Sequence, residues 1–130
     1  MQVSLPDHLF ADLPLYDVPS GPDSLVVDLH HRPDLADERG ALHDGLIATL
    51  IDVAGGRLAH DLASLGSGVG TADMKIHYVE PVTVGPARAT ATIVHRGADV
   101  IITAVDVVDV GTDRLAARST LSFAVMQPRA

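Results

Sequence analysis

The hydrophobic residues follow two different spacings along the chain, one helical and one extended. From residue 45 to residue 63 there is no proline, and in the first three turns of a helix over this segment apolar residues fall on nearly every side. This pattern predicts one long helix that the rest of the protein surrounds on most sides, with Asp44 as a suitable N-cap residue. Gly55 and Gly56 each cost about 1 kcal/mol relative to alanine inside a helix. We therefore expect them to allow a neighbouring element to approach closely.

A period of two predicts the strands. After residue 70 the chain either alternates polar and apolar residues or is rich in β-branched residues, and turn sequences separate the segments. One segment before the helix, SLVVDLHH, has the same character. The predicted strands are residues 24–31, 71–79, 87–95, 100–110 and 115–125. These elements indicate an α+β fold in which an antiparallel sheet of about five strands wraps round one long central helix.

The remaining segments complete the predicted organisation. Pro6 and Asp7 are suited to the start of a short helix at 5–12, and a proline-rich connector follows at 13–22. Residues 32–42 form a polar loop before the long helix. The length of 130 residues fits a single domain. Because one helix leaves an edge of the sheet uncovered, we expect a homodimer or homotetramer with paired edge strands.

The composition and the charge narrow the classes of function. Aromatic residues make up 3% of the chain and the net charge is −8, which argues against nucleic-acid binding. Residues 1–65 carry three basic and eleven acidic groups, against six and six in 66–130, so an anionic ligand would meet the second half. There is no cysteine, and the seven histidines have no metal-ligand spacing, so we expect no metal site. Since no signal peptide or membrane span is recognisable, we expect a cytoplasmic protein.

Asp52 is the main candidate for chemistry. It is the only acidic residue between 45 and 60, and its neighbours in the sequence are Ile51 and Val53. Burying an unpaired carboxylate costs free energy, so such a residue is kept for a reason. The alternative is a structural acid that a nearby hydroxyl or Arg57 satisfies.

The segment around Asp52 resembles a known enzyme family. The pattern G-x-L-H-x-G-x-x-x-T-L-x-D is formed by Gly40, Leu42, His43, Gly45, Thr49, Leu50 and Asp52. It is similar to the signature of the hotdog-fold acyl-CoA thioesterases of the phenylacetate-pathway (PaaI-like) type. The later segments GTADMKIHYVEPV and VHRG resemble that family too, so the resemblance spans roughly residues 24–126.

The resemblance implies a role for each residue that matches the motif. Asp52 corresponds to the helix carboxylate that activates water or attacks the thioester carbonyl. The backbone N–H groups of Asp44 and Gly45 correspond to the position that stabilises the oxyanion, and His43 to the residue that helps place the thioester. Thr71 corresponds to a hydroxyl residue that a second subunit offers to the same site.

The resemblance also implies the substrate. Arg96 and Gly97 lie where the family's basic turn meets the phosphates of coenzyme A, and Arg118 is a further candidate for this contact. Coenzyme A is then part of an acyl-CoA substrate, and no separate cofactor is expected. The acyl group is not revealed by the sequence.

Two positions depart from the family pattern. Asp44 stands where the family usually has a glycine, and Asp37 stands where it often has asparagine. An added acid beside the oxyanion position would oppose the developing negative charge. These departures suit one alternative to thioester hydrolysis, a hotdog module that binds acyl-CoA without cleaving it. A hotdog dehydratase or hydratase is a further alternative.

Overall fold

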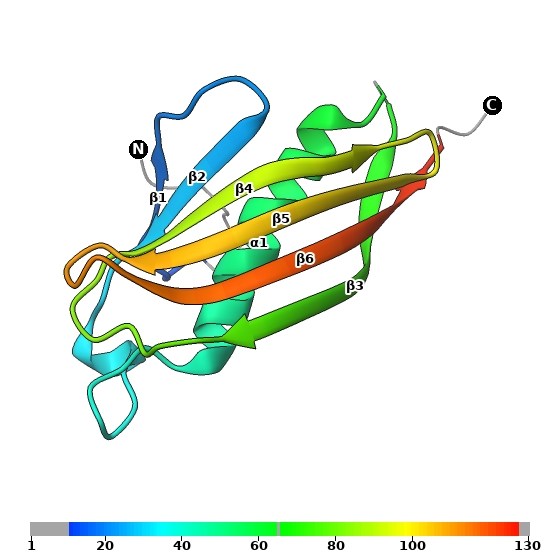
Figure 1. Cartoon of the computed structure of the whole chain (residues 1–130). Helices are drawn as coiled ribbons and strands as arrows, with labels where there is room; N and C mark the ends of the chain where they lie inside the picture. The colour runs from blue at the N-terminus through cyan, green and yellow to red at the C-terminus, as the bar shows by residue number, and fades with distance from the viewer. Residues whose placement is uncertain (1–10, 65, 128–130) are drawn as a thin grey trace.

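A curved sheet of six antiparallel strands packs against one long helix in the computed structural model, which describes residues 11–64 and 66–127 (Figure 1). The order of the strands in the sheet is β1-β2-β4-β5-β6-β3. The predicted α+β arrangement is confirmed. The elements are β1 (Leu15–Val18), β2 (Ser24–Leu29), the short 3₁₀ helix η1 (Pro33–Leu35), α1 (Asp44–Leu62), β3 (Gly68–Tyr78), β4 (Ala87–Arg96), β5 (Val100–Asp109) and β6 (Arg114–Met126).

The sixth strand, β1, lies in the segment predicted to be a connector. It pairs with β2 from Leu15 opposite Leu29 to Val18 opposite Val26. Pro14 and Pro19 flank it, and prolines are tolerated at the ends of an edge strand because the ladder does not need their missing N–H. Most of the short helix predicted for residues 5–12 lies outside the described residues.

The core lies between α1 and the concave face of the sheet. Small residues on β4, Ala89 and Ala91, are fully buried and let the helix come close. A Cβ atom at Gly55 would lie 2.9 Å from Thr103 Oγ1, so close approach is confirmed for this glycine. At Gly56 the nearest atom would be 3.6 Å away, which is ordinary contact. The buried residues of α1 are Ile47, Leu50, Ile51, Ala54, Gly55, Leu58, Ala59 and Leu62.

One side of α1 is not covered by the described chain. Gly45 and Asp52 are exposed, and Ala48, Thr49 and Val53 between them are only partly buried. Protein thus covers α1 on the side that faces the sheet, whereas the side that carries Gly45 and Asp52 is open in the single chain.

Strand β3 forms one edge of the sheet beside this open side of the helix. Among the described strands it pairs only with β6. Its residues from Thr71 to Lys75 are all exposed. An edge strand of 11 residues carries a long row of unpaired N–H and C=O groups.

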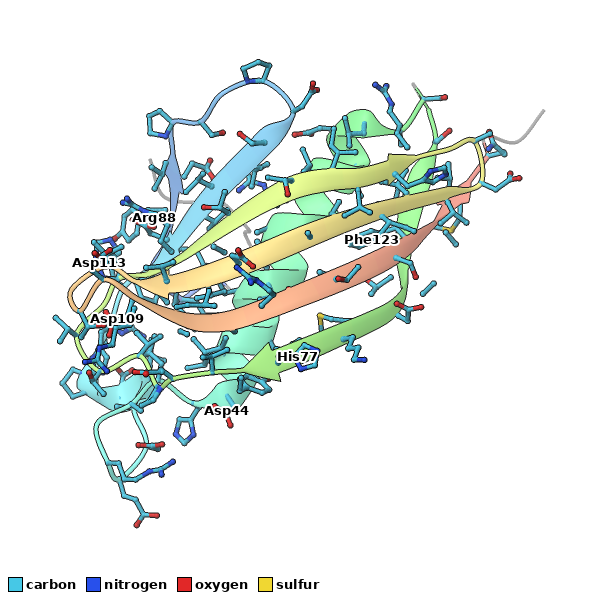
Figure 2. All side chains as sticks on the ribbon, in the orientation of Figure 1. Asp44, His77, Arg88, Asp109, Asp113 and Phe123 are labelled. Atoms are coloured by element: carbon cyan, nitrogen blue, oxygen red, sulfur yellow. The ribbon has the colours of Figure 1, made fainter. Side chains whose placement is uncertain are left out.

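The buried carboxylate of Asp109 holds the turn between β3 and β4 against the sheet by hydrogen bonds. Asp109, at the end of β5, is fully buried. Its Oδ1 accepts hydrogen bonds from the N–H groups of Gly85 (2.8 Å) and Gly111 (3.1 Å). Its Oδ2 accepts hydrogen bonds from Thr83 (3.0 Å) and Val84 (3.2 Å). Figure 2 shows Asp109 at the end of the sheet where this turn and the β5–β6 hairpin meet.

Candidate functional site

The start of α1 presents two free backbone donors. His43, not Asp44, occupies the N-cap position, and its side chain makes no capping hydrogen bond. The N–H groups of Leu46 and Ile47 both donate to the His43 carbonyl oxygen, at 2.9 and 3.2 Å. The N–H groups of Asp44 and Gly45 precede them and find no acceptor among the described residues. Together with the positive end of the helix dipole, they could stabilise a negatively charged oxygen.

An open cleft of about 490 Å³ adjoins this helix start. His43 and Gly45 are among the residues that line this cleft. A substrate group that binds the Gly45 N–H would therefore lie next to the cleft. The surface that lines it is mainly apolar. The other lining residues are Leu13, Asp34, Leu35, Leu46 and Thr49.

Asp52 is exposed on the open side of α1, which corrects the expectation that it is buried. The Thr71 hydroxyl donates a hydrogen bond to Asp52 Oδ1 at 2.9 Å. Thr71 was expected to reach Asp52 from a second subunit, but in this structure it belongs to the same chain. Its position on β3, beside the helix, makes that contact possible. One carboxylate oxygen is thus held by Thr71 while Asp52 stays open to solvent.

The helix geometry separates the two parts of the candidate site. Gly45 and Asp52 are seven residues apart, which is almost two turns, so they lie on the same side of α1. The rise over seven residues is about 10 Å. A carbonyl oxygen bonded to the Gly45 N–H lies about 3 Å from it. Within one chain, Asp52 therefore does not reach a carbonyl carbon held at the helix start.

Tyr78 is a residue near the site that the sequence did not single out. Its hydroxyl donates to the carbonyl oxygen of Asp44 at 3.1 Å. Burial, and then the negative charge of Asp44, raise the pKa of Tyr78 above its usual value. Tyr78 also lines a smaller cleft of about 190 Å³ together with Asp44, Ile47 and Glu80. In the sequence, the signal that could have pointed to Tyr78 is its place in the DMKIHY segment, which resembles the family.

Asp37 closes the loop before the helix. Its Oδ1 accepts hydrogen bonds from the N–H groups of Arg39 (2.8 Å) and Ala41 (3.1 Å). These bonds hold the pKa of Asp37 below its usual value. The carboxylate at this departure from the family pattern thus stabilises a turn in its own loop.

The residues predicted to contact coenzyme A lie away from the helix start. Arg96 Nε donates to the carbonyl oxygen of Leu62, the last residue of α1, at 3.1 Å. The 19 residues of α1 extend over about 28 Å, so Arg96 is at the far end of the helix from His43. Gly97 follows in the turn after β4, where its N–H donates to Val100 O at 2.9 Å.

Arg118 lies on the face of the sheet that points away from α1. Its neighbours along β6, Ala117 and Ser119, are buried, whereas Arg118 is exposed. The guanidinium forms two hydrogen bonds of 3.0 Å with the carboxylate of Asp106 on β5. A single chain therefore brings together His43, Asp44 and Gly45, and separately Asp52 and Thr71, but not the arginines.

Two further properties concern only the part of the chain that the structure describes. It contains no group of three or more His, Asp or Glu residues arranged to hold a metal ion. Within 11–64 and 66–127, no helix combines the length and apolar character that crossing a bilayer requires.

Comparison with solved structures confirms the hotdog fold. A thioesterase of Haemophilus influenzae superimposes with a TM-score of 0.87 at 20% identity, covering 94% of this chain and 85% of that one. A Bacillus halodurans protein solved with CoA is 32% identical, with a TM-score of 0.72, and the match covers 78% of this chain and 66% of that one.

Sequence comparison agrees with the structural matches. An esterase candidate of Saccharolobus solfataricus is 26% identical over 104 residues, which are 80% of this chain and 73% of the relative. The family model described as the Thioesterase superfamily matches residues 39–116. That segment is more than half of the chain and includes the helix start, Asp52, Thr71 and Tyr78. The protein therefore belongs to the thioesterase superfamily.

Proposed function

We propose that this protein hydrolyses an acyl- or aryl-CoA thioester and belongs to the phenylacetate-pathway (PaaI-like) type within the superfamily. The observation that carries the proposal is the presence, on one face of α1, of an exposed carboxylate paired with a hydroxyl and of two free backbone donors. The 32% identical Bacillus halodurans protein was solved with CoA, which supports a CoA-type ligand.

The active site is formed by two chains in this proposal. Asp52 and Gly45 of one chain are about 10 Å apart along the helix, too far to act on one carbonyl group. If a second copy places its α1 antiparallel to the first, Asp52 of one chain comes opposite Gly45 of the other. The unpaired edge of β3 and the open side of α1 are the surfaces available for this contact.

The chemistry follows from these positions. The thioester carbonyl oxygen accepts hydrogen bonds from the Asp44 and Gly45 N–H groups, and His43 helps to place the thioester. Asp52 takes a proton from water, whose oxygen forms a bond with the carbonyl carbon. The Thr71 hydroxyl fixes the carboxylate by binding Oδ1. When the carbon–sulfur bond breaks, the thiolate of CoA leaves and receives the proton that Asp52 holds.

The cleft beside the helix start suits the acyl part of the substrate. Its mainly apolar lining favours an uncharged, apolar acyl or aryl group. The proposed contacts for the CoA phosphates remain Arg96, Gly97 and Arg118. These residues lie outside the cleft, so the CoA part of the substrate would extend beyond it. Because CoA is part of the substrate, the reaction needs no separate cofactor.

The test is thiol release from short-chain, long-chain and aromatic CoA esters. We expect Asp52→Asn to lower kcat by about a hundredfold or more, the usual range for loss of a positioned general base. Asp61→Asn is the matched control, because Asp61 is an exposed acid on the same helix near its C-terminal end. Unchanged hydrolysis by Asp52→Asn would rule out the proposed role.

One observation favours a second candidate function, a module that binds acyl-CoA without cleaving it. Asp44 places an exposed carboxylate in the first turn of α1, next to the proposed oxyanion position. Calorimetric titration with an acyl-CoA distinguishes the two candidates. Binding of the intact ester without thiol release would favour the binding module.

A further inference from the structure

The hydroxyl of Tyr78 is bonded directly to the first turn of α1. Tyr78 is the last residue of β3, and the end of this strand lies beside the start of the helix (Figure 1). The hydroxyl donates to the Asp44 carbonyl oxygen at 3.1 Å, and the side chain remains 48% exposed. A half-exposed tyrosine therefore makes a specific polar contact with the backbone of the proposed site.

This contact acts on the peptide group that carries the Gly45 N–H. The carbonyl of Asp44 and the N–H of Gly45 belong to the same planar unit. A hydrogen bond accepted by the carbonyl restrains the tilt of that plane. It also polarises the unit, so that its N–H becomes a stronger donor. The Gly45 N–H is one of the two N–H groups at the start of α1 that find no acceptor among residues 11–64 and 66–127.

We propose that Tyr78 is a positioning residue for the oxyanion donor: its hydroxyl orients and polarises the peptide that offers the Gly45 N–H to the substrate. This inference rests on the proposed thioester hydrolysis at the helix start. Tyr78 acts through the backbone and does not itself need to touch the substrate.

Burial and one neighbouring charge, that of Asp44, favour the role of Tyr78 as a donor. Asp44, Arg39 and Glu80 line the small cleft that Tyr78 shares with the helix start. Burial and the Asp44 carboxylate raise the pKa of Tyr78, so its hydroxyl keeps its proton under ordinary conditions. The Tyr78 hydroxyl therefore stays a hydrogen-bond donor at neutral pH.

Kinetics of Tyr78→Phe test the inference, because this change removes only the hydroxyl. We expect kcat to fall about three- to tenfold, less than the hundredfold or more lost when an oxyanion donor itself is removed. KM should stay within about twofold, since the ground-state thioester binds this donor less strongly than the oxyanion does. A role limited to holding β3 against α1 would lower the stability and leave kcat unchanged.

Ser119→Ala is the matched control. The Ser119 hydroxyl also donates to a backbone carbonyl, that of Val105 at 2.7 Å, but it is buried inside the sheet. This variant should lose stability without losing kcat. If Asp52→Asn abolishes hydrolysis while Tyr78→Phe retains the full kcat, the inference about Tyr78 is overturned and the proposed function stands.

A second measurement does not depend on activity. In the ¹H–¹⁵N spectrum of the full protein, Tyr78→Phe should shift the Gly45 amide signal, whereas Ser119→Ala should leave it in place. An unmoved Gly45 signal in Tyr78→Phe overturns the inference whether or not the protein hydrolyses a thioester. Conversely, hydrolysis that survives Asp52→Asn rejects the proposed function, while the Gly45 signal still decides whether Tyr78 positions this peptide.

Discussion

Replacing Asp109 with asparagine removes half of a buried hydrogen-bond cluster. Each carboxylate oxygen of Asp109 accepts two backbone N–H groups. The NH₂ group of asparagine is itself a donor, so two of the four N–H groups lose their acceptor whichever way the amide is turned. Hydrogen bonds to a charged group contribute about 1.5–3 kcal/mol each. We therefore expect Asp109→Asn to lower the free energy of unfolding by about 3–6 kcal/mol.

Urea denaturation at pH 7 measures this loss, with the protein concentration held fixed because association changes apparent stability. Asp106→Asn is the control on the same strand. Asp106 pairs with Arg118 on the surface, where the two side chains are 43% and 65% exposed. Such a pair contributes at most about 1 kcal/mol. A loss in Asp109→Asn as small as that in the control would refute the reasoning.

The same cluster predicts a pH dependence. Burial alone would raise the pKa of Asp109, but hydrogen bonds from Gly85, Val84, Thr83 and Gly111 outweigh it and lower the pKa below its usual value. The carboxylate therefore stabilises the fold fully above the unfolded-state pKa of about 3.9, and this contribution is lost as the pH falls through the folded-state pKa. The stability difference between wild type and Asp109→Asn should be constant near neutral pH and should narrow below about pH 4. If this stability difference stays constant below about pH 4, the expected loss of the Asp109 contribution on protonation is contradicted.

Three further changes have defined outcomes. Asp44→Asn keeps the backbone N–H but removes a negative charge beside the oxyanion, so kcat for thiol release should rise about threefold or more; an unchanged or lower kcat would contradict this. Gly55→Ala places a methyl group 2.9 Å from Thr103 Oγ1 and should cost about 1–3 kcal/mol in urea denaturation; full stability would show that the helix can move away. Arg96→Ala should raise KM for an acyl-CoA about tenfold but not for the acyl-pantetheine, which lacks the nucleotide phosphates; equal effects on both esters would exclude a phosphate contact.

The sequence predicted most of the fold because local signals agreed with the tertiary structure. The strand predicted at 100–110 is observed at Val100–Asp109, between turns that glycines at 97 and 111 mark in the sequence. β1 was missed because its four residues lie between prolines and are too few to show a period. Its place at the edge of the sheet is set by pairing with β2, which the local pattern does not show.

The exposure of Asp52 could not be predicted from the helix alone. The apolar residues Ala48 and Val53 lie on the open side of α1 and are only partly buried, and their sequence pattern is the same whether they face a core or a second chain. The start of the helix predicted at 45 lies within one residue of the observed start at Asp44, and the role that the motif implies for Asp52 stays a prediction. The motif did not show that Thr71 binds Asp52 within one chain, or that the Tyr78 hydroxyl reaches Asp44, because both contacts join segments distant in sequence.

A mixed dimer tests the central claim that each active site takes Asp52 from one chain and the helix start from another. Gly45→Pro removes the N–H donor at a position where proline is compatible with the first turn of a helix. It should be inactive alone, as should Asp52→Asn. Co-expression with two affinity tags isolates dimers that contain one chain of each variant. We expect about half of the wild-type kcat per dimer, because one of the two sites is then intact; mixed dimers without activity would contradict a site shared between chains.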